Sequence, residues 1–111
     1  MQEAADAVVV FVTASSADEA ATLARALVAE RLAACVNRVP VESVYQWQGQ
    51  VEEAAEVLLV IKTRRSLLDA LAARVRALHS YTVPEIIALP IVAGWPPYLQ
   101  WIADETTPSA P

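Results

Sequence analysis

The sequence is poor in the residues that build the most recognisable sites: its 111 residues include two glycines, one cysteine and one histidine. Gly49 and Gly94 alone cannot supply the glycine-rich loop of a dinucleotide-binding or phosphate-binding motif. Cys35 has no second cysteine for an internal disulfide, and a closed structural zinc site needs about four Cys or His ligands. These shortages exclude proteins built on such loops, on internal disulfides or on a structural zinc ion held by one chain.

Positive charge is also scarce. Eight Lys and Arg residues stand against 13 Asp and Glu residues, which gives a net charge of −5. An acidic protein repels phosphate backbones, so nucleic acid is not expected as a partner. No apolar run reaches the roughly 18 residues of a membrane-spanning helix, and the first residues lack the positive charge of a secretory signal. We therefore expect a cytoplasmic protein without a membrane or nucleic-acid partner.

Apolar surface, in contrast, is abundant. Hydrophobic residues make up 56% of the chain and charged residues 19%, which is typical of a folded domain and not of a disordered chain. The length corresponds to one domain, since domains commonly contain about 100 to 200 residues. A small domain buries only roughly 60 to 68% of the surface that its unfolded chain exposes. Other subunits are therefore expected to cover part of the apolar surface that remains.

Runs of β-branched and aromatic residues alternate along the chain with stretches whose apolar residues recur every three or four positions. The runs predict strands, and the stretches predict amphipathic helices. Gly49 lies between two runs and predicts the tight turn of a long β-hairpin, while Pro40 predicts a bend or bulge in its first strand. We expect strands over residues 7–13, 34–48, 51–63 and 85–92, and helices over residues 18–32, between Ser66 and His79, and over residues 96–103.

The predicted order of elements indicates the fold. It is βαββαβ followed by a helix, so we predict an α+β, ferredoxin-like fold with a long β-hairpin and a short C-terminal helix. The single domain spans residues 7–105, with a flexible N-terminus over residues 1–6 and a disordered tail over residues 106–111. Two helices cover one face of a four-stranded sheet, yet several strands are apolar on both faces. A second copy of the sheet is the simplest cover for the other face, which predicts a homo-oligomer.

His79 and Cys35 are candidate ligands, but each has a more common structural role. His79 ends the predicted second helix, where it can bind a metal ion or carry a proton. A histidine at this place more often bonds to the last helical carbonyls. Cys35 lies in an apolar stretch, where free cysteine usually behaves as a small buried apolar residue. We favour the structural role for both residues on local sequence alone.

The predicted hairpin carries carboxylates and aromatic rings. Glu52 and Glu56 can share a face and offer oxygens to a divalent cation, although a solvated acidic arm is more common. Tyr45 and Trp47 also share a face, as an aromatic platform for a ligand or, in the interpretation we prefer, as anchors of an oligomer interface. Lys62 ends an apolar strand, where it can bind an anion but more often extends its amine into solvent.

Several ordered motifs together resemble one known family. They are residues 8–10 (VVV), 32–37 (LAACVN), 43–49 (SVYQWQG), 62–63 (KT), 79–85 (HSYTVPE) and 98–102 (YLQWI). In this order and spacing the chain resembles the CutA divalent-cation tolerance family over about residues 7–105. Several motifs at compatible spacing are far more specific than any one of them.

The resemblance implies a ferredoxin-like homotrimer, similar to the PII signalling proteins, that binds copper, zinc or other divalent cations. It implies no enzyme activity, no organic cofactor and a protein partner of unknown identity. The family's histidine, glutamate and cysteine metal ligands correspond to His79, Glu56 and Val12. Because Val12 cannot bind a metal, the expected site is a weak one of imidazole and carboxylate that has lost its copper(I)-selective donor. The family's His-Pro-Tyr is His79-Ser80-Tyr81 here, which puts the path of the following loop in question.

The resemblance implies two alternative functions, whereas the sequence does not favour an acylphosphatase-like hydrolase. The first is a trimeric divalent-cation-binding and tolerance protein with His79 and Glu56 as metal ligands. The alternative is a PII-like trimer that senses a small molecule in an intersubunit cleft lined by Trp47, Lys62, Tyr81 and Glu85. An acylphosphatase-like hydrolase would need an Arg-bearing phosphate loop after the first strand, and residues 13–18 contain neither Arg nor Gly.

Overall fold

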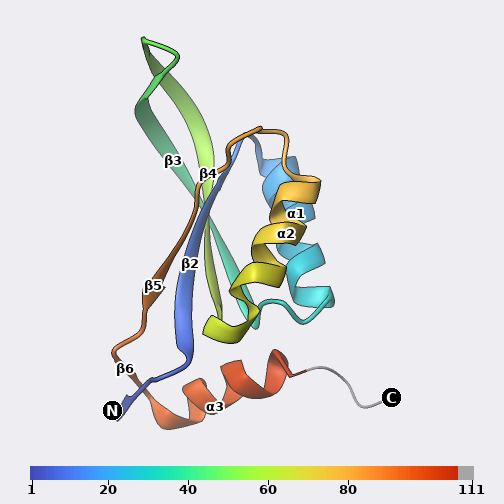
Figure 1. The fold of residues 1–111 in the computed structure, drawn as a ribbon, viewed down its shortest axis with the longest axis vertical. Coiled ribbons are helices and arrows are strands. Elements are labelled where there is room, and N and C mark those ends of the chain that lie inside the picture. The colour runs from blue at the N-terminus through green and yellow to red at the C-terminus, as the bar shows by residue number, and fades with distance from the viewer. Residues whose placement is uncertain (108–111) are drawn as a thin grey trace.

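In the computed structural model, which describes residues 1–107, a four-stranded antiparallel sheet packs against two helices, and a third helix lies across its end (Figure 1). The sheet has the strand order β3-β4-β2-β5, and β1 pairs with β6 in a separate two-stranded sheet. The main elements follow the order β2-α1-β3-β4-α2-β5, which confirms the predicted α+β ferredoxin-like fold. The elements are β1 (Gln2–Glu3), β2 (Ala7–Ala14), α1 (Ala17–Ala29), β3 (Cys35–Trp47), β4 (Gln50–Arg64), the 3₁₀ turn η1 (Arg65–Leu67), α2 (Leu68–Leu78), β5 (Ile86–Pro90), β6 (Ala93–Gly94) and α3 (Pro96–Glu105).

The core lies between the sheet and helices α1 and α2. Alternate side chains of β2 point into it, as the period of two in a strand requires. The buried stripe of each helix supplies the other half, at the three- and four-residue spacing seen in the sequence. Full burial of one Val or Leu side chain is worth roughly 1.5 to 3 kcal/mol. The central residues are Val8, Val10, Val12, Ala14, Ala20, Leu23, Leu27, Leu59, Ile61, Leu71 and Val75.

Helix α1 has a defined cap at each end. The hydroxyl of Ser16 accepts a hydrogen bond from the main-chain N–H of Glu19 at 3.1 Å, which satisfies one free donor of the first turn. At the other end Arg31 has φ of +60°, and the N–H of Leu32 bonds back to the carbonyl of Leu27 at 2.9 Å. This left-handed cap ends the helix before the predicted residue 32. None of the helices in residues 1–107 has the length and apolar character needed to cross a membrane.

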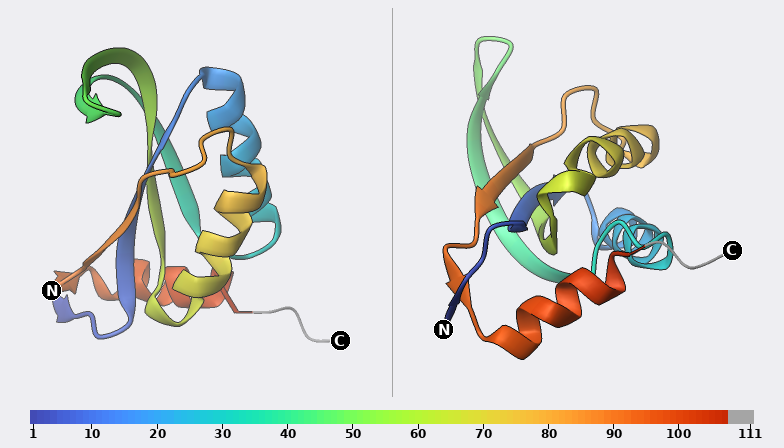
Figure 2. Two further views of the ribbon diagram at one scale, coloured as in Figure 1. Left: turned by 45° about the horizontal axis from the view of Figure 1, so that its top comes forward. Right: turned by 60° about the horizontal axis from the view of Figure 1, so that its bottom comes forward.

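Strands β3 and β4 form the predicted long hairpin. Their register runs unbroken from Cys35 opposite Lys62 to Trp47 opposite Gln50, and Gln48 and Gly49 both have positive φ, as a two-residue hairpin turn requires. Strand β2 pairs with β4 only as far as Val57, so residues 41–56 project beyond the rest of the sheet (Figure 1, Figure 2). Of the bend or bulge predicted at Pro40, the bulge is wrong, because β3 is an edge strand, where a missing N–H is tolerated in an unbroken register.

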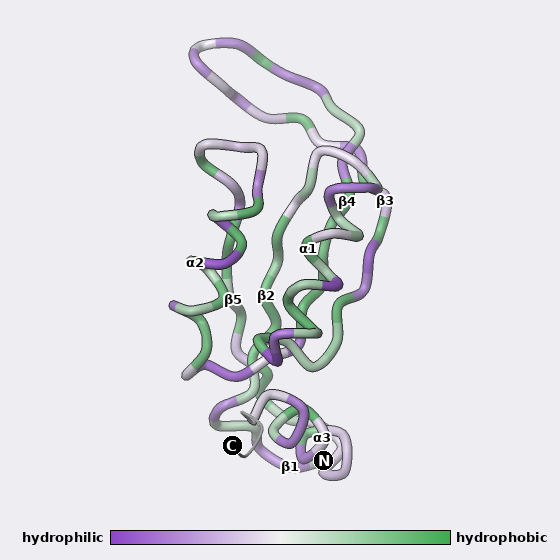
Figure 3. The backbone as a smooth tube through the Cα atoms, turned by 90° about the vertical axis from the view of Figure 1, so that its right-hand side faces the viewer, coloured by the Kyte–Doolittle hydropathy of each residue, from purple (hydrophilic) through white to green (hydrophobic). Residues whose placement is uncertain are grey.

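The face of the sheet turned away from α1 and α2 is apolar and lacks a covering layer in residues 1–107 (Figure 2). Val9 and Phe11 of β2 alternate with the core residues and therefore lie on this face. Cross-strand partners share a face, and Leu89 and Ile87 of β5 pair with Val9 and Phe11. Leu89 is 41% exposed and Ile87 is 52% exposed. In Figure 3 the strands β2 and β5 are coloured mostly as hydrophobic, whereas the hairpin includes many residues coloured as hydrophilic.

Both chain ends carry more structure than the sequence predicts. Residues 1–6 were expected to be flexible, but Gln2–Glu3 pairs as β1 with Ala93–Gly94. The tail was expected to be disordered from residue 106, whereas Thr106 is buried and its hydroxyl bonds to the carbonyl of Ile102. Local composition could not predict this order, because β1 pairs with β6 and Thr106 also bonds to Arg64, both from distant parts of the chain. Residues 108–111 of the predicted tail lie outside the described residues.

The buried hydroxyl of Thr106 ties α3 to the sheet, since Nε of Arg64 donates to it at 2.8 Å. Thr106→Val keeps the shape of the side chain but removes this acceptor. We expect the free energy of unfolding in urea to fall by about 1 to 3 kcal/mol, the cost of a buried donor left without a partner. The matched control is Thr107→Val, since Thr107 is exposed and its hydroxyl donates to the carbonyl of Ala103 in its own helix. Equal losses for the two variants at one protein concentration would contradict this role.

Candidate functional site

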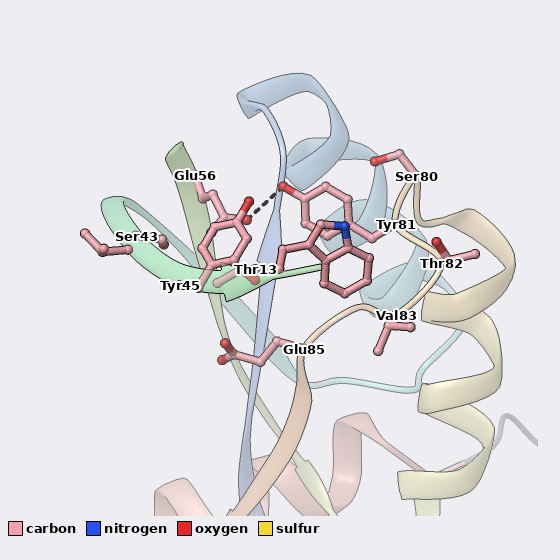
Figure 4. A pocket seen from close by; sticks show the side chains of 11 residues that line it. Thr13, Ser43, Tyr45, Glu56, Ser80, Tyr81, Thr82, Val83 and Glu85 are labelled. Atoms are coloured by element: carbon pink, nitrogen blue, oxygen red, sulfur yellow. Dashed lines mark hydrogen bonds between the residues drawn. The ribbon is translucent and has the colours of Figure 1, made fainter. Parts of the chain in front are cut away.

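A pocket of about 620 Å³ opens where the β3–β4 hairpin leaves the sheet (Figure 4). Small-molecule sites commonly measure about 300 to 1,000 Å³. The projecting hairpin forms one wall, and the loop from α2 to β5 forms the other. The lining residues are Thr13, Ser43, Val44, Tyr45, Trp47, Glu56, Ser80, Tyr81, Thr82, Val83 and Glu85.

Glu56 is the innermost charged group of this pocket, with only 8% of its surface exposed. The hydroxyl of Tyr81 donates a hydrogen bond to Oε2 of Glu56 at 2.8 Å (Figure 4). Burial, followed by the bond to Glu56 and the charge of Glu56, raises the pKa of Tyr81 to about 12. Tyr81 therefore remains a protonated donor at neutral pH and holds the carboxylate in place.

The charged groups of the pocket have one sign. Glu56 and Glu85 are carboxylates, and the lining within residues 1–107 includes no Lys, Arg or His. Tyr45, Trp47 and Tyr81 supply three aromatic rings beside these carboxylates. Carboxylates attract cations directly, and the faces of aromatic rings attract them through the ring quadrupole. The pocket is therefore suited to a positively charged ligand.

His79 lies next to the pocket but is not among its lining residues. Its side chain is fully buried, its Nε2 lies 2.7 Å from the carbonyl oxygen of Thr13, and its Nδ1 accepts the N–H of Tyr81 at 3.0 Å. A carbonyl can only accept and a main-chain N–H can only donate, so both contacts are satisfied by the neutral ring protonated at Nε2. The imidazole therefore bonds to the end of β2, and only the main-chain N–H of His79 bonds to a helical carbonyl, that of Val75. A metal ion could bind His79 only if one of these hydrogen bonds broke.

Glu19 is a half-buried residue that the sequence analysis did not single out as part of the site. Its carboxylate accepts hydrogen bonds from the main-chain N–H groups of Ser15 and Ser80, both at 2.9 Å, and lies 3.9 Å from Nδ1 of His79. Burial alone would raise the pKa of Glu19, but the bonds from Ser15 and Ser80 outweigh it and lower the pKa to about 2. The available signal was the spacing of Ser16 and Glu19, which is that of a capping box.

The structure brings together three of the four residues predicted for the ligand cleft. Trp47, Tyr81 and Glu85 of the predicted ligand cleft line the same pocket, and Glu56 joins them. Lys62 is not among the lining residues of this pocket. Its amine instead contacts the side-chain oxygen of Asn37 and lies 4.0 Å from the sulfur of Cys35.

The predicted metal ligands are not assembled into a cluster. Tyr81 contacts both His79, at 4.8 Å between ring centroids, and Glu56. Val12 is fully buried in the hydrophobic core. Among residues 1–107 no group of three or more His, Cys, Asp or Glu side chains is placed to hold a metal ion. Any cation bound here must take part of its coordination from water or from another subunit.

Comparisons with known proteins agree on one family. The sequence profile of the CutA1 divalent ion tolerance proteins matches residues 8–105. The divalent-cation tolerance protein CutA of Thermus thermophilus is 54% identical over 99 residues, which cover 88% of this chain and 96% of that protein. The crystal structure of CutA1 from Oryza sativa has a TM-score of 0.90 at 51% identity and covers 94% of this chain and 96% of that one.

The chain matches only part of some longer relatives. The chloroplastic protein CutA 1 of Oryza sativa subsp. japonica is 52% identical over 103 residues, which cover 92% of this chain but 58% of that protein. The corresponding share of the chloroplastic CutA of Arabidopsis thaliana is 55%. This chain therefore spans little more than half the length of these two relatives.

The hydrogen bonds to Glu19 predict a specific loss of stability in acid. The pKa of Glu19 is lowered from 4.5 to about 2 in the folded protein, so its contribution is full above about pH 4.5 and is lost as the pH falls toward 2. Glu19→Gln should lower the free energy of unfolding at pH 7 by on the order of 3 kcal/mol. The difference in the free energy of unfolding between variant and wild type should disappear as the pH falls from 4.5 to 2, as measured by urea unfolding. A gap of constant size over this range would show that Glu19 does not act through its charge.

Proposed function

This chain belongs to the CutA1 divalent ion tolerance protein family, and we propose that it is a homotrimer that binds divalent cations weakly and contributes to cation tolerance. The observation that carries the proposal is the buried carboxylate of Glu56 in a pocket whose lining includes Glu85 and no cationic side chain within residues 1–107. Such a pocket concentrates cations and repels anions. The family name supplies the divalent class, and the pocket supplies a place for the cation.

Glu56 is the protein ligand on which cation binding rests. Oε2 already accepts the Tyr81 hydroxyl, and a carboxylate can accept further contacts through its remaining lone pairs. With carboxylate and water ligands alone, affinity is weak and follows the general order of divalent metals, in which Cu²⁺ binds more tightly than Zn²⁺. His79 can add an imidazole ligand to Glu56 only after losing its bond to Tyr81 or to Thr13.

The trimer is supported by the apolar sheet face opposite α1 and α2. Ile87 and Leu89 are exposed there beside Val9 and Phe11, and the edges of the sheet are the strands β3 and β5. An exposed apolar face of this kind is typical of a protein–protein interface. Copies of the same sheet are the simplest partners, because in a cyclic homo-oligomer the apolar face of each subunit can pack against that of its neighbours. The pocket lies beside this face, so neighbouring subunits can complete it.

Hydrolase chemistry is not part of the proposal. In a phosphate-binding hydrolase of this topology the loop from β2 to α1 would offer its N–H groups to the substrate anion. Here the carboxylate of Glu19 already accepts the N–H of Ser15, and the hydroxyl of Ser16 accepts the N–H of Glu19. A second anion at this place would meet the negative charge of Glu19. The β2–α1 loop therefore does not offer the anion site that an acylphosphatase-like hydrolase needs.

A second candidate function is supported by the size and walls of the pocket. A volume of about 620 Å³ is more than a metal ion needs, and the aromatic rings of Trp47 and Tyr81 are not metal ligands. These features suit a small organic molecule, as in a PII-like trimer that senses a metabolite between subunits. Lys62, which was expected in this cleft, lies outside its lining.

Calorimetric titration with Cu²⁺ tests the metal site. Glu56→Gln removes the buried charge, and we expect the dissociation constant to rise roughly tenfold or more, equivalent to about 1.4 kcal/mol. The matched control is Glu53→Gln, which makes the same charge change at an exposed position of the same strand. His79→Ala should affect stability more than Cu²⁺ affinity. If Glu53→Gln weakens binding as much as Glu56→Gln, the cation is held by general surface charge.

Sedimentation equilibrium at micromolar protein tests the assembly. Wild type should sediment as a trimer, and Leu89→Glu should raise the dissociation constant at least roughly tenfold, because burying an unpaired carboxylate costs several kcal/mol. Val28→Glu is the matched control, since Val28 is 43% exposed on α1, at the other side of the molecule, and Leu89 is 41% exposed. A monomeric wild type, or equal effects of the two variants, would overturn the proposed trimer.

A further inference from the structure

We propose that the pocket beside Glu56 binds an organic cation of the alkylammonium class. The inference rests on the second proposed function, a small-molecule site, and names the chemistry of its ligand. Three independent features of the pocket lead to it: the sign of its charge, the nature of its walls and its size.

The charge of the pocket selects a cation. Only 8% of the surface of Glu56 is exposed, and within residues 1–107 the hydroxyl of Tyr81 is the hydrogen-bond donor to its carboxylate. Glu85 adds a second carboxylate, and the lining within residues 1–107 contains no basic side chain to balance the two. A buried carboxylate is stabilised most by a partner of opposite charge that displaces no strong hydrogen bond. An anionic or neutral ligand cannot provide this.

The walls of the pocket favour an organic cation over a metal ion. Tyr81 points toward Glu56 in Figure 4, and the rings of Tyr45 and Trp47 also line the pocket. Trp47 is 44% exposed and Tyr45 is 39% exposed, so both offer surface to a ligand. Alkyl groups around an ammonium spread its charge and gain from contact with aromatic faces, which typically contributes about 0.5 to 2 kcal/mol per ring. A hydrated metal ion gains little from the same surface.

The size of the pocket agrees with this class. A volume of about 620 Å³ accommodates a molecule of several carbon atoms next to Glu56. The hydroxyl groups of Ser43, Ser80 and Thr82 line the same space and can bond to a polar substituent of the ligand. Because the ammonium and a divalent metal both use Glu56, each should weaken the binding of the other by the same factor.

The test compares two probes of equal shape on wild-type protein by calorimetry: choline and its uncharged isostere 3,3-dimethyl-1-butanol. We expect choline to bind at least roughly tenfold more tightly, since only the charged probe neutralises Glu56. Added Cu²⁺ should reduce choline affinity. If the alcohol binds as well as choline, the pocket is a small-molecule site that does not select cations, and the inference is overturned while the second proposed function stands. If neither probe binds but Glu56→Gln still weakens Cu²⁺ binding, the inference fails and the metal function stands.

Two variants test the aromatic wall. Trp47→Leu should weaken choline binding roughly tenfold and leave Cu²⁺ binding unchanged, because only the organic cation uses the indole face. Trp95→Leu is the matched control, as Trp95 is 65% exposed and is not among the lining residues. Sedimentation equilibrium confirms that each variant keeps the wild-type assembly. If Trp47→Leu binds choline as tightly as Trp95→Leu does, the aromatic wall has no part in recognition and the inference is wrong. The comparison of the two probes needs no variant and therefore decides the question even if Trp47→Leu does not fold.

Discussion

The central strand β2 imposes the constraint on which the rest of this structure depends. It pairs with β4 on one side and with β5 on the other, and its alternate residues from Val8 to Ala14 fill the core under α1 and α2. Period-two alternation then leaves Val9 and Phe11 on the opposite face, where no helix covers them in residues 1–107. One strand thus determines both the hydrophobic core within the chain and the apolar surface available to other copies.

The end of β2 also positions the pocket. The carbonyl of Thr13 accepts Nε2–H of His79, Nδ1 of His79 accepts the N–H of Tyr81, and the hydroxyl of Tyr81 donates to Glu56. In this series of hydrogen bonds each group fixes the position of the proton on the next group. This holds because a carbonyl, a neutral imidazole and a carboxylate have defined donor and acceptor sites. The only histidine therefore acts through the loop that follows it. It places Tyr81 against Glu56, and its position next to the pocket does not require it to bind a ligand.

The sequence predicted the elements well and their long-range contacts poorly. Hydrophobic periodicity located the strands and helices, because burial of one face imposes the same period on any chain. It could not show that Pro40 lies on an edge strand, where no bulge is needed, or that Thr106 lies against Arg64. The resemblance to a family drew attention to His79 and Tyr81 through their motif, and to Glu56 as the counterpart of a metal ligand of the family. Motifs do not record hydrogen bonds, so the partners of His79 and the separation of Lys62 from the pocket appeared only in the structure.

The pairing of β2 also has a consequence for the order in which the chain can fold. The β3–β4 hairpin closes through the two-residue turn at Gln48 and Gly49, and such local hairpins form within about 1 to 10 μs. Strand β2 must instead find β5, where Val8 pairs with Pro90 across most of the chain, and contacts of such long sequence separation form slowly. Until β5 arrives, one edge of β2 and the apolar face beside it are open to other chains. An unpaired strand edge can pair with a strand of another chain, so slow closing of the β2–β5 edge favours aggregation.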